Sequence, residues 1–299
     1  MAYRNIFIAN EAKLKLKSNQ LIVFNGQEYS FPIEDIRSIV IDNPYTSLTG
    51  KLIAKLADDG VCLIICNEKH IPSCELLPIG AYCRLNKRIN LQYAQSKPRL
   101  KQIWQKIVQA KIVNQAKCLE LNKIIEAETL YSISRNVLSG DSTNREGYAS
   151  RVYFKSLFGS DFTREKESNI NAALNYGYAI LRSYIAKTIV SYGLEPSFGV
   201  HHKSQLNQFN LADDIIEPYR PVIDNFVYKN CCEWGEQFFT PQKAELQLLL
   251  NSAIIIDGKR HSVANAIELT VQSIVTAFES ENIRLKLPNL IDIEYFDYD

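Results

Sequence analysis

The spacing of apolar residues changes once along this chain, near Gly80, and this change limits the folds open to it. Before Gly80 the apolar runs are short and follow the period of a β-strand, as in Ala12–Lys17, where apolar and charged residues alternate. Asn25-Gly26 lies between two such runs and is a hairpin turn signal. After Gly80, apolar residues recur at helical spacing, as they do over residues 98–112. The sequence therefore predicts an α+β protein.

Two domains are expected, divided near Gly80. The first, residues 1–80, is β-rich. The second, residues 81–299, is larger and all-α. Strands are expected in the first domain at 6–8, 12–17, 21–24, 28–33, 36–41, 61–66 and 75–79, with one helix at 46–59. Helices are expected in the second at 98–112, 124–138, 144–154, 169–192, 211–229, 241–253 and 261–279.

The composition is that of an ordinary protein without a membrane span. Among 299 residues, 46% are hydrophobic and 22% are charged, and no stretch of 18 uncharged apolar residues occurs. The seven cysteines form no CxxC pair, which indicates reduced thiols. We therefore expect a cytoplasmic protein with no membrane partner. The chain end after Pro288 is acidic and aromatic, and it is expected to be either mobile or bound to a partner.

Positive charge is concentrated in one segment. The net charge is +1, yet residues 81–117 contain nine Lys and Arg and no Asp or Glu. Such a local field suits a phosphate backbone; the alternative is a solvated basic helix face. The candidate DNA-binding residues in this segment are Arg84, Lys87, Arg88, Lys101, Lys106 and Lys111.

Residues 199–221 hold the densest set of metal-binding side chains. His201 and His202 are adjacent, and the helix that follows carries Asp213, Asp214 and Glu217. Imidazole and carboxylate groups are the ligands that hold divalent cations for phosphoryl chemistry. The alternative is a capped, solvated helix preceded by a polar loop, and periodicity alone favours this alternative.

Helical geometry makes the arrangement of this segment more specific. Asn210 is the expected N-cap, and a kink is expected just beyond Glu217 because prolines follow it at positions 218 and 221. On a helical wheel, Asp213, Glu217 and Asp224 share a face with Arg220, and this face is expected to point outward. Asp214 lies at the edge of the stripe.

A further acidic residue, Glu146, is expected in the first turn of a helix capped by Asn144. Its local context indicates a carboxylate that complements the helix dipole. Nothing in its own neighbourhood indicates a metal ligand.

Several motifs together resemble the CRISPR-associated integrase, the adaptation endonuclease that inserts spacers into CRISPR arrays. They are Arg145-Glu146-Gly147, Asn175-Tyr176-Gly177-Tyr178, Gly193-Leu194-Glu195-Pro196, Gly199-Val200-His201-His202, and the run from Asn210 to Pro221. The resemblance covers nearly the whole chain and is strongest to members from type II systems. It implies a metal site built from Glu146, His202 and Glu217, with Mg²⁺ or Mn²⁺ as cofactor, and therefore makes residues 81–299 the expected catalytic domain. His201 is the less favoured histidine, and Asp214 is an assisting residue.

The resemblance also implies the reaction and the partners. A 3′-hydroxyl of a short DNA fragment would attack a phosphodiester at the edge of a CRISPR repeat, so both DNA duplexes are substrates. The family works as homodimers bridged by a small second adaptation protein, and the β-rich domain 1–80 is the expected dimer surface. A type II accessory protein and the effector nuclease are further candidate partners. Two other hypotheses remain: a non-catalytic DNA-binding scaffold, and a general metal-dependent DNase.

Overall fold

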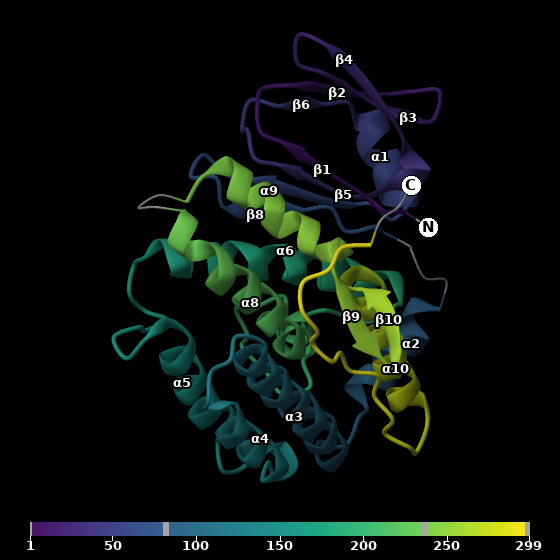
Figure 1. Cartoon of the computed structure of the whole chain (residues 1–299). Helices are drawn as coiled ribbons and strands as arrows, with labels where there is room; N and C mark the ends of the chain where they lie inside the picture. Colours follow the sequence, from purple (N-terminus) through teal and green to yellow (C-terminus); the bar gives the residue numbers. More distant parts are fainter. Residues whose placement is uncertain (1, 80–83, 235–237, 297–299) are drawn as a thin grey trace.

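The computed structural model describes residues 2–79, 84–234 and 238–296. The strands of the N-terminal part gather at one end of the molecule, and the helices fill the rest (Figure 1). The order predicted from the sequence, strands first and helices second, is therefore confirmed. The boundary predicted near Gly80 lies outside the described residues. None of the helices in the described ranges combines the length and the hydropathy that a bilayer crossing requires.

The N-terminal part contains two sheets and a helix. One sheet has the strand order β1-β5-β7-β8 and the other β4-β3-β2-β6. The strands are β1 (Arg4–Ile8), β2 (Lys13–Lys17), β3 (Gln20–Phe24), β4 (Glu28–Pro32), β5 (Ile36–Ile41), β6 (Ser47–Leu48), β7 (Cys62–Cys66) and β8 (Pro72–Glu75). The helix α1 spans Gly50–Asp58, and Thr49 caps it by accepting from Leu52 N–H. The last strand was expected at residues 75–79, whereas β8 spans Pro72–Glu75. The short strand β6 was not predicted.

The central strands of the first sheet, β5 and β7, are buried on both faces, and this explains their continuous apolar sequences. Successive side chains of a strand point to opposite faces. Val40 and Ile64 belong to the core shared with the helices. Ile39, Ile41 and Leu63 belong to a separate core inside the N-terminal part. The sheet therefore joins the two halves of the molecule.

The second part is built on long helices. They are α2 (Leu85–Tyr93), α3 (Lys97–Leu121), α4 (Ala127–Arg135), α5 (Arg145–Phe158), α6 (Asn169–Ser191), α7 (Asn210–Ile216), α8 (Arg220–Asn230), α9 (Thr240–Leu248) and α10 (Val263–Glu279). The kink predicted beyond Glu217 is confirmed, because a 3₁₀ turn, Glu217–Tyr219, separates α7 from α8. At the crossing of α6 and α8, a Cβ on Gly177 would lie 2.6 Å from Ile223 Cγ2, so only glycine permits this approach.

The prediction that the second part is all-α is wrong. Two strands, β9 (Ala253–Ile256) and β10 (Lys259–Ser262), form an antiparallel hairpin between α9 and α10. Asp257 and Gly258 make its turn, and both have positive φ, at 49° and 73°. This is the Asp-Gly turn chemistry of a two-residue hairpin.

The chain end follows this hairpin rather than leaving the molecule. Ala253 N–H donates to Glu294 O at 2.7 Å, and Tyr295 forms a bridge with Ser252. Residues up to Phe296 therefore have a place in the fold. The last residues of the expected mobile end, 297–299, lie outside the described residues.

Candidate metal centre

The first carboxylate of the candidate site stands at the start of α5. Asn144 adopts φ 50° and caps this helix, as predicted, by accepting from Gly147 N–H at 3.2 Å. Asp141 accepts from the backbone N–H groups of Arg145 and Glu146, at 2.8 and 3.0 Å. These contacts fix the first turn of α5 and with it the position of Glu146. Its side chain is 31% exposed.

The second carboxylate, Glu217, is buried between two cations. Lys111 from α3 forms an ion pair with Glu217 Oε2, and Arg220 Nε donates to Glu217 Oε1 at 2.9 Å. Burial alone would raise the pKa of Glu217, but Arg220 and Lys111 outweigh it and lower the pKa to about 2. Glu217 is therefore a carboxylate at neutral pH although it is only 6% exposed.

Lys111 brings the two carboxylates together. Its Nζ forms one ion pair with Glu217 and another with Glu146 Oε1. Burial alone would lower the pKa of Lys111, but the charges of Glu217 and Glu146 raise it above its ordinary value. Segments far apart in the sequence thus converge on a single ammonium group.

Asp214 organises the histidine loop. Its carboxylate accepts from the backbone N–H groups of Val200, His201 and His202, at 2.5, 2.9 and 3.2 Å. His202 Nδ1 lies 2.7 Å from Asp214 Oδ1. Because a carboxylate only accepts, Nδ1 carries the proton, and Nε2 keeps its lone pair for a ligand. This contact also raises the pKa of His202.

The two histidines make different ring contacts. The ring of His201 stacks on Trp104 of α3, with centroids 4.3 Å apart and planes 4° apart. Trp104 meets His202 only edge-on, at 5.8 Å. His201 therefore packs its face on an indole, while the ring of His202 is held through Asp214.

The outward orientation predicted for the acidic stripe is wrong for Glu217 and Asp224, which are 6% and 1% exposed. Asp213 and Arg220 of the stripe are partly buried, and Asp214 at its edge is fully buried. Asp224 accepts from the hydroxyl groups of Tyr153, at 3.0 Å, and of Tyr178. Tyr178 in turn faces Arg220, whose guanidinium carbon lies 4.5 Å from the ring centroid. Glu217 and Asp224 point into the protein because each finds a partner on another element.

Asn210 is also not the N-cap that was predicted. Phe209 occupies that position, and Asn210 is the first residue of α7. Its amide donates to Ser197 O at 3.0 Å and to Ser204 O at 2.9 Å. Asn210 therefore ties the two ends of the histidine loop to the helix.

The donor set suits a hard divalent cation. Glu146 and Glu217 would supply oxygen ligands to such an ion, and His202 would supply one free ring nitrogen. Across residues 2–79, 84–234 and 238–296, no three His, Cys, Asp or Glu side chains are grouped closely enough to form a ready-made metal cluster. The ammonium of Lys111, a single positive charge, stands between the two carboxylates instead.

The basic segment divides into exposed and buried residues. Arg84, Lys87, Lys101 and Lys106 are exposed, as a phosphate-binding surface requires. Arg88 forms an ion pair with Glu279 at 3.1 Å. For Lys111 the prediction of a DNA-binding surface residue is wrong, because it is 7% exposed and belongs to the carboxylate site.

Sequence reasoning missed the role of Lys111, although a signal was present. It lies four residues after Ile107 and three after Val108, both fully buried. A lysine on the apolar stripe of a helix needs a buried counter-charge. The helical pattern of α3 therefore placed Lys111 inside the protein, but it did not name the carboxylates that meet it.

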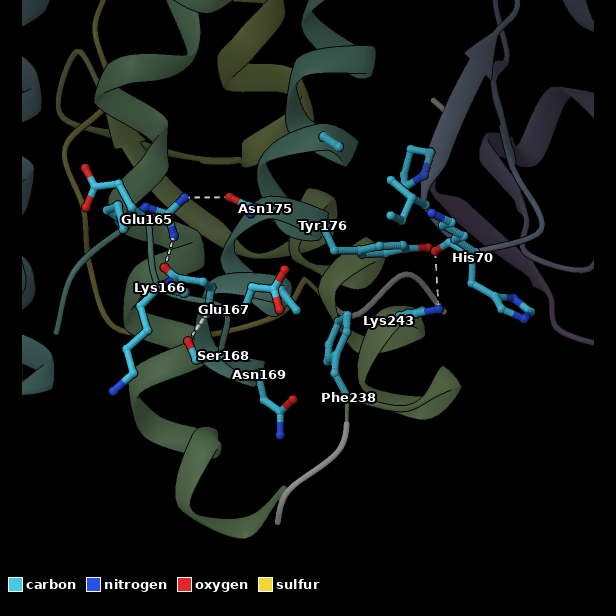
Figure 2. Close-up of a pocket in the computed structure, with 17 residues that line it drawn as sticks. His70, Glu165, Lys166, Glu167, Ser168, Asn169, Asn175, Tyr176, Phe238 and Lys243 are labelled. Atoms are coloured by element: carbon cyan, nitrogen blue, oxygen red, sulfur yellow. Dashed lines mark hydrogen bonds between the residues drawn. The ribbon is translucent and has the colours of Figure 1, made fainter.

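A hollow of about 740 Å³ lies apart from this site. His70, Tyr176, Phe238 and Lys243 line one side of it, and the segment 164–169 lines another (Figure 2). Neither Glu146, His202 nor Glu217 borders it. The candidate centre is therefore not defined by this cavity but by converging charged side chains.

Comparison with known proteins decides the family. The family described as "CRISPR associated protein Cas1" matches residues 6–255. The chain belongs to the Cas1 family. Over its full length it is 39% identical to the full length of the CRISPR-associated endonuclease Cas1 of Neisseria meningitidis. It is 26% identical to a Cas1 endonuclease of Francisella tularensis, over 90% of this chain and 93% of the relative. The resemblance drawn from the sequence motifs is confirmed.

Solved structures show the same fold. A casposase bound to integration product matches with a TM-score of 0.76 at 21% identity, over 95% of this chain and 92% of that one. A Cas1 protein from Thermotoga maritima matches with a TM-score of 0.72 at 15% identity, over 94% and 98% of the two chains. The β-then-α architecture is thus that of the Cas1 fold.

Proposed function

We propose that this member of the Cas1 family is a metal-dependent DNA integrase and endonuclease of CRISPR adaptation, which inserts short DNA fragments into the CRISPR array. Membership of a family whose curated relatives are named endonucleases supports the nuclease part. The casposase of the same fold, which was solved bound to an integration product, supports the integration part. The observation that carries the proposal is that Glu146 and Glu217 meet at a single charged group, Lys111.

In this proposal Glu146, Glu217 and His202 hold Mg²⁺ or Mn²⁺. When bound, such an ion polarises a phosphoryl oxygen, lowers the pKa of an attacking hydroxyl and stabilises the leaving oxygen. The chain supplies what the ion needs. Arg220 and Lys111 keep Glu217 ionised, and Asp214 keeps the proton of His202 on Nδ1. Because Asp214 is already satisfied by the loop, it is a positioning residue rather than a ligand in this account.

The substrates follow from the reaction. Attack by the 3′-hydroxyl of a donor fragment on a repeat phosphodiester joins the donor to the repeat strand and releases a 3′-hydroxyl. One phosphodiester forms as another breaks, so the reaction needs no oxidant or covalent protein intermediate. With water as the attacking group the same site hydrolyses DNA. The exposed cations Arg84, Lys87, Lys101 and Lys106 would hold the phosphates of these duplexes.

The partners are proposed on similar grounds. A solved assembly, the Cas6-RT-Cas1--Cas2 complex, contains a chain that matches with a TM-score of 0.69 at 16% identity, over 92% of this chain and 35% of that one. The Cas2 component of that complex supports a small second adaptation protein as a partner. A homodimer, a type II accessory protein and the effector nuclease complete the proposed set, and the cytoplasm is the proposed location.

The test is a strand-transfer assay with a repeat-containing plasmid and a labelled donor duplex. Transfer is expected with Mg²⁺ or Mn²⁺ and a 3′-hydroxyl donor, and it should stop with EDTA or with a 3′-dideoxy donor. Glu217→Gln should reduce transfer at least a hundredfold, whereas Glu128→Gln, an exposed position on α4, should leave it unchanged. Cleavage without regard to the repeat or the donor end would indicate a general DNase. Full DNA binding with no metal-dependent product would indicate a non-catalytic scaffold.

A further inference from the structure

Lys111 is an unusual residue for the centre of a metal site. It is 7% exposed, and its ammonium lies against Glu146 and Glu217, the two carboxylates that would hold the cation. Burying an ammonium is unfavourable unless opposite charges surround it. Here two carboxylates from different elements do so.

The contact with Lys111 also stabilises the two carboxylates in their ionised forms. Glu217 is buried, and two neighbouring carboxylates repel one another when both are ionised. The two carboxylates carry a charge of −2, which Lys111 reduces to −1 and Arg220, beside Glu217, reduces to zero. A divalent cation would make the same contacts with twice the charge.

We infer that Lys111 is a resident counter-cation of this site, which holds Glu146 and Glu217 together in the metal-free protein and is displaced when the divalent cation binds. This inference rests on the proposed function, because it requires a metal at those carboxylates. It adds to that function a competition between a side chain of the protein and its cofactor. Lys111 is a positioning residue in this account, since it acts through the carboxylates.

Competition has a consequence that a purely structural role does not have. A side chain that only supports the site lowers metal affinity when it is removed. A competing cation raises metal affinity when it is removed, because the ion no longer displaces a charge and Glu217 keeps Arg220 as its counter-ion while Glu146 loses Lys111. Two unit charges about 4 Å apart interact by several kcal/mol at an effective dielectric of about 20. Partial exposure of Glu146 reduces this value, so we expect an increase in affinity of at least about tenfold.

The variants for the test are Lys111→Met, which keeps the length of the side chain, and Lys111→Gln, which keeps a polar end. The control is Lys106→Met on the same helix, because Lys106 is exposed and its loss changes the net charge equally. The measurement is Mn²⁺ binding to the full chain by electron paramagnetic resonance and calorimetry, with thermal unfolding in EDTA and in Mn²⁺.

The expected result has two parts. Without metal, both Lys111 variants unfold at a lower temperature than the wild type. Addition of Mn²⁺ raises the unfolding temperature of both variants more than that of the wild type. Their Mn²⁺ dissociation constants fall at least about tenfold, while Lys106→Met stays within about twofold of the wild type. If Lys111→Met does not fold without metal, the Mn²⁺ dissociation constant of Lys111→Gln is compared with that of the wild type instead.

The outcomes separate this inference from the proposed function. Binding by the wild type, with equal or weaker binding by the Lys111 variant that folds, would overturn the counter-cation role and leave the metal site standing. No Mn²⁺ binding by the wild type or by any variant would overturn the metal site itself, and the counter-cation role with it.

Discussion

Replacement of Asp214 is expected to lower both the stability of the fold and its affinity for Mn²⁺. Asp214 is fully buried and accepts four hydrogen bonds from the histidine loop, three from backbone N–H groups and one from the ring of His202. The change we consider is Asp214→Asn, which keeps the shape and one carbonyl oxygen. The other oxygen becomes an NH₂ group, which faces donors instead of accepting from them.

The expected change in the free energy of unfolding follows from the number of hydrogen bonds that are lost. Each oxygen of Asp214 accepts two bonds, so the amide loses at least two of the four. A hydrogen bond to a charged group contributes roughly 1.5–3 kcal/mol, and a donor left buried and unpaired adds a penalty. We therefore expect Asp214→Asn to lower the free energy of unfolding by about 3–5 kcal/mol. Because His202 loses its orienting partner, Mn²⁺ affinity should also fall about 10–100-fold.

The assay is urea unfolding followed by circular dichroism, with Mn²⁺ titration of the folded variant. The neighbouring Asp213→Asn is a matched control, because Asp213 is only partly buried and its side chain accepts one bond, from Asn207 Nδ2 at 2.7 Å. It should lower the free energy of unfolding by about 1 kcal/mol and keep Mn²⁺ affinity. Equal effects of the two substitutions on stability and on Mn²⁺ affinity would refute the role assigned to Asp214.

Three further predictions concern the loop, the basic surface and the pH dependence of stability. A Cβ on Gly199 would lie 2.3 Å from His202 O, so Gly199→Ala should lower the free energy of unfolding by about 1–3 kcal/mol and weaken Mn²⁺ binding; Gly50→Ala, which meets open space, should do neither. Lys101→Glu with Lys106→Glu should weaken DNA binding in fluorescence anisotropy and flatten its salt dependence, and an unchanged salt slope would show that this face does not contact DNA. Because the pKa of Glu217 falls from 4.5 to about 2 on folding, its stabilisation of roughly 3 kcal/mol is present above pH 4.5 and lost as the pH falls toward 2. In urea unfolding with EDTA, Glu217→Gln should therefore show a shallower acid transition than the wild type, and parallel curves would contradict this.

Local rules were sufficient for most elements. The alternating pattern of residues 12–17 and the Asn25-Gly26 turn predicted β2, β3 and β4 near their observed limits. Asn144 was predicted as a cap from its place before a helical run, and its side chain makes that bond. Each of these depends on residues that are close in the sequence, and a local pattern can report them.

Local sequence patterns did not predict whether the acidic face of the helix points to solvent or into the protein. A helical wheel groups Glu217 and Asp224 on one face, but it does not say whether that face meets water or protein. Their partners, Lys111 and Tyr153, lie 71 or more residues away. A charged stripe is therefore predicted to be solvent-exposed when the positions of the other helices are not known. The resemblance named Glu146 and Glu217 as one site, and the structure supplied the group that joins them.

The hairpin of β9 and β10 was missed for a different reason. Its strands are four residues each, and they lie between two strongly helical segments. Asp257-Gly258 carried the turn signal, but the first strand, Ala253–Ile256, is a continuous apolar run without alternation. Such a short run does not separate strand from helix by period alone.

The central claim is that Glu146, His202 and Glu217 hold one divalent cation in the place now bridged by Lys111. The most direct measurement is a crystal structure of the protein with Mn²⁺, with anomalous scattering recorded to locate the ion. We expect an anomalous peak in contact with both carboxylates and His202 Nε2, with the Lys111 ammonium moved away from at least one of them. No peak at this position under saturating Mn²⁺, with Lys111 still joining the two glutamates, would contradict it.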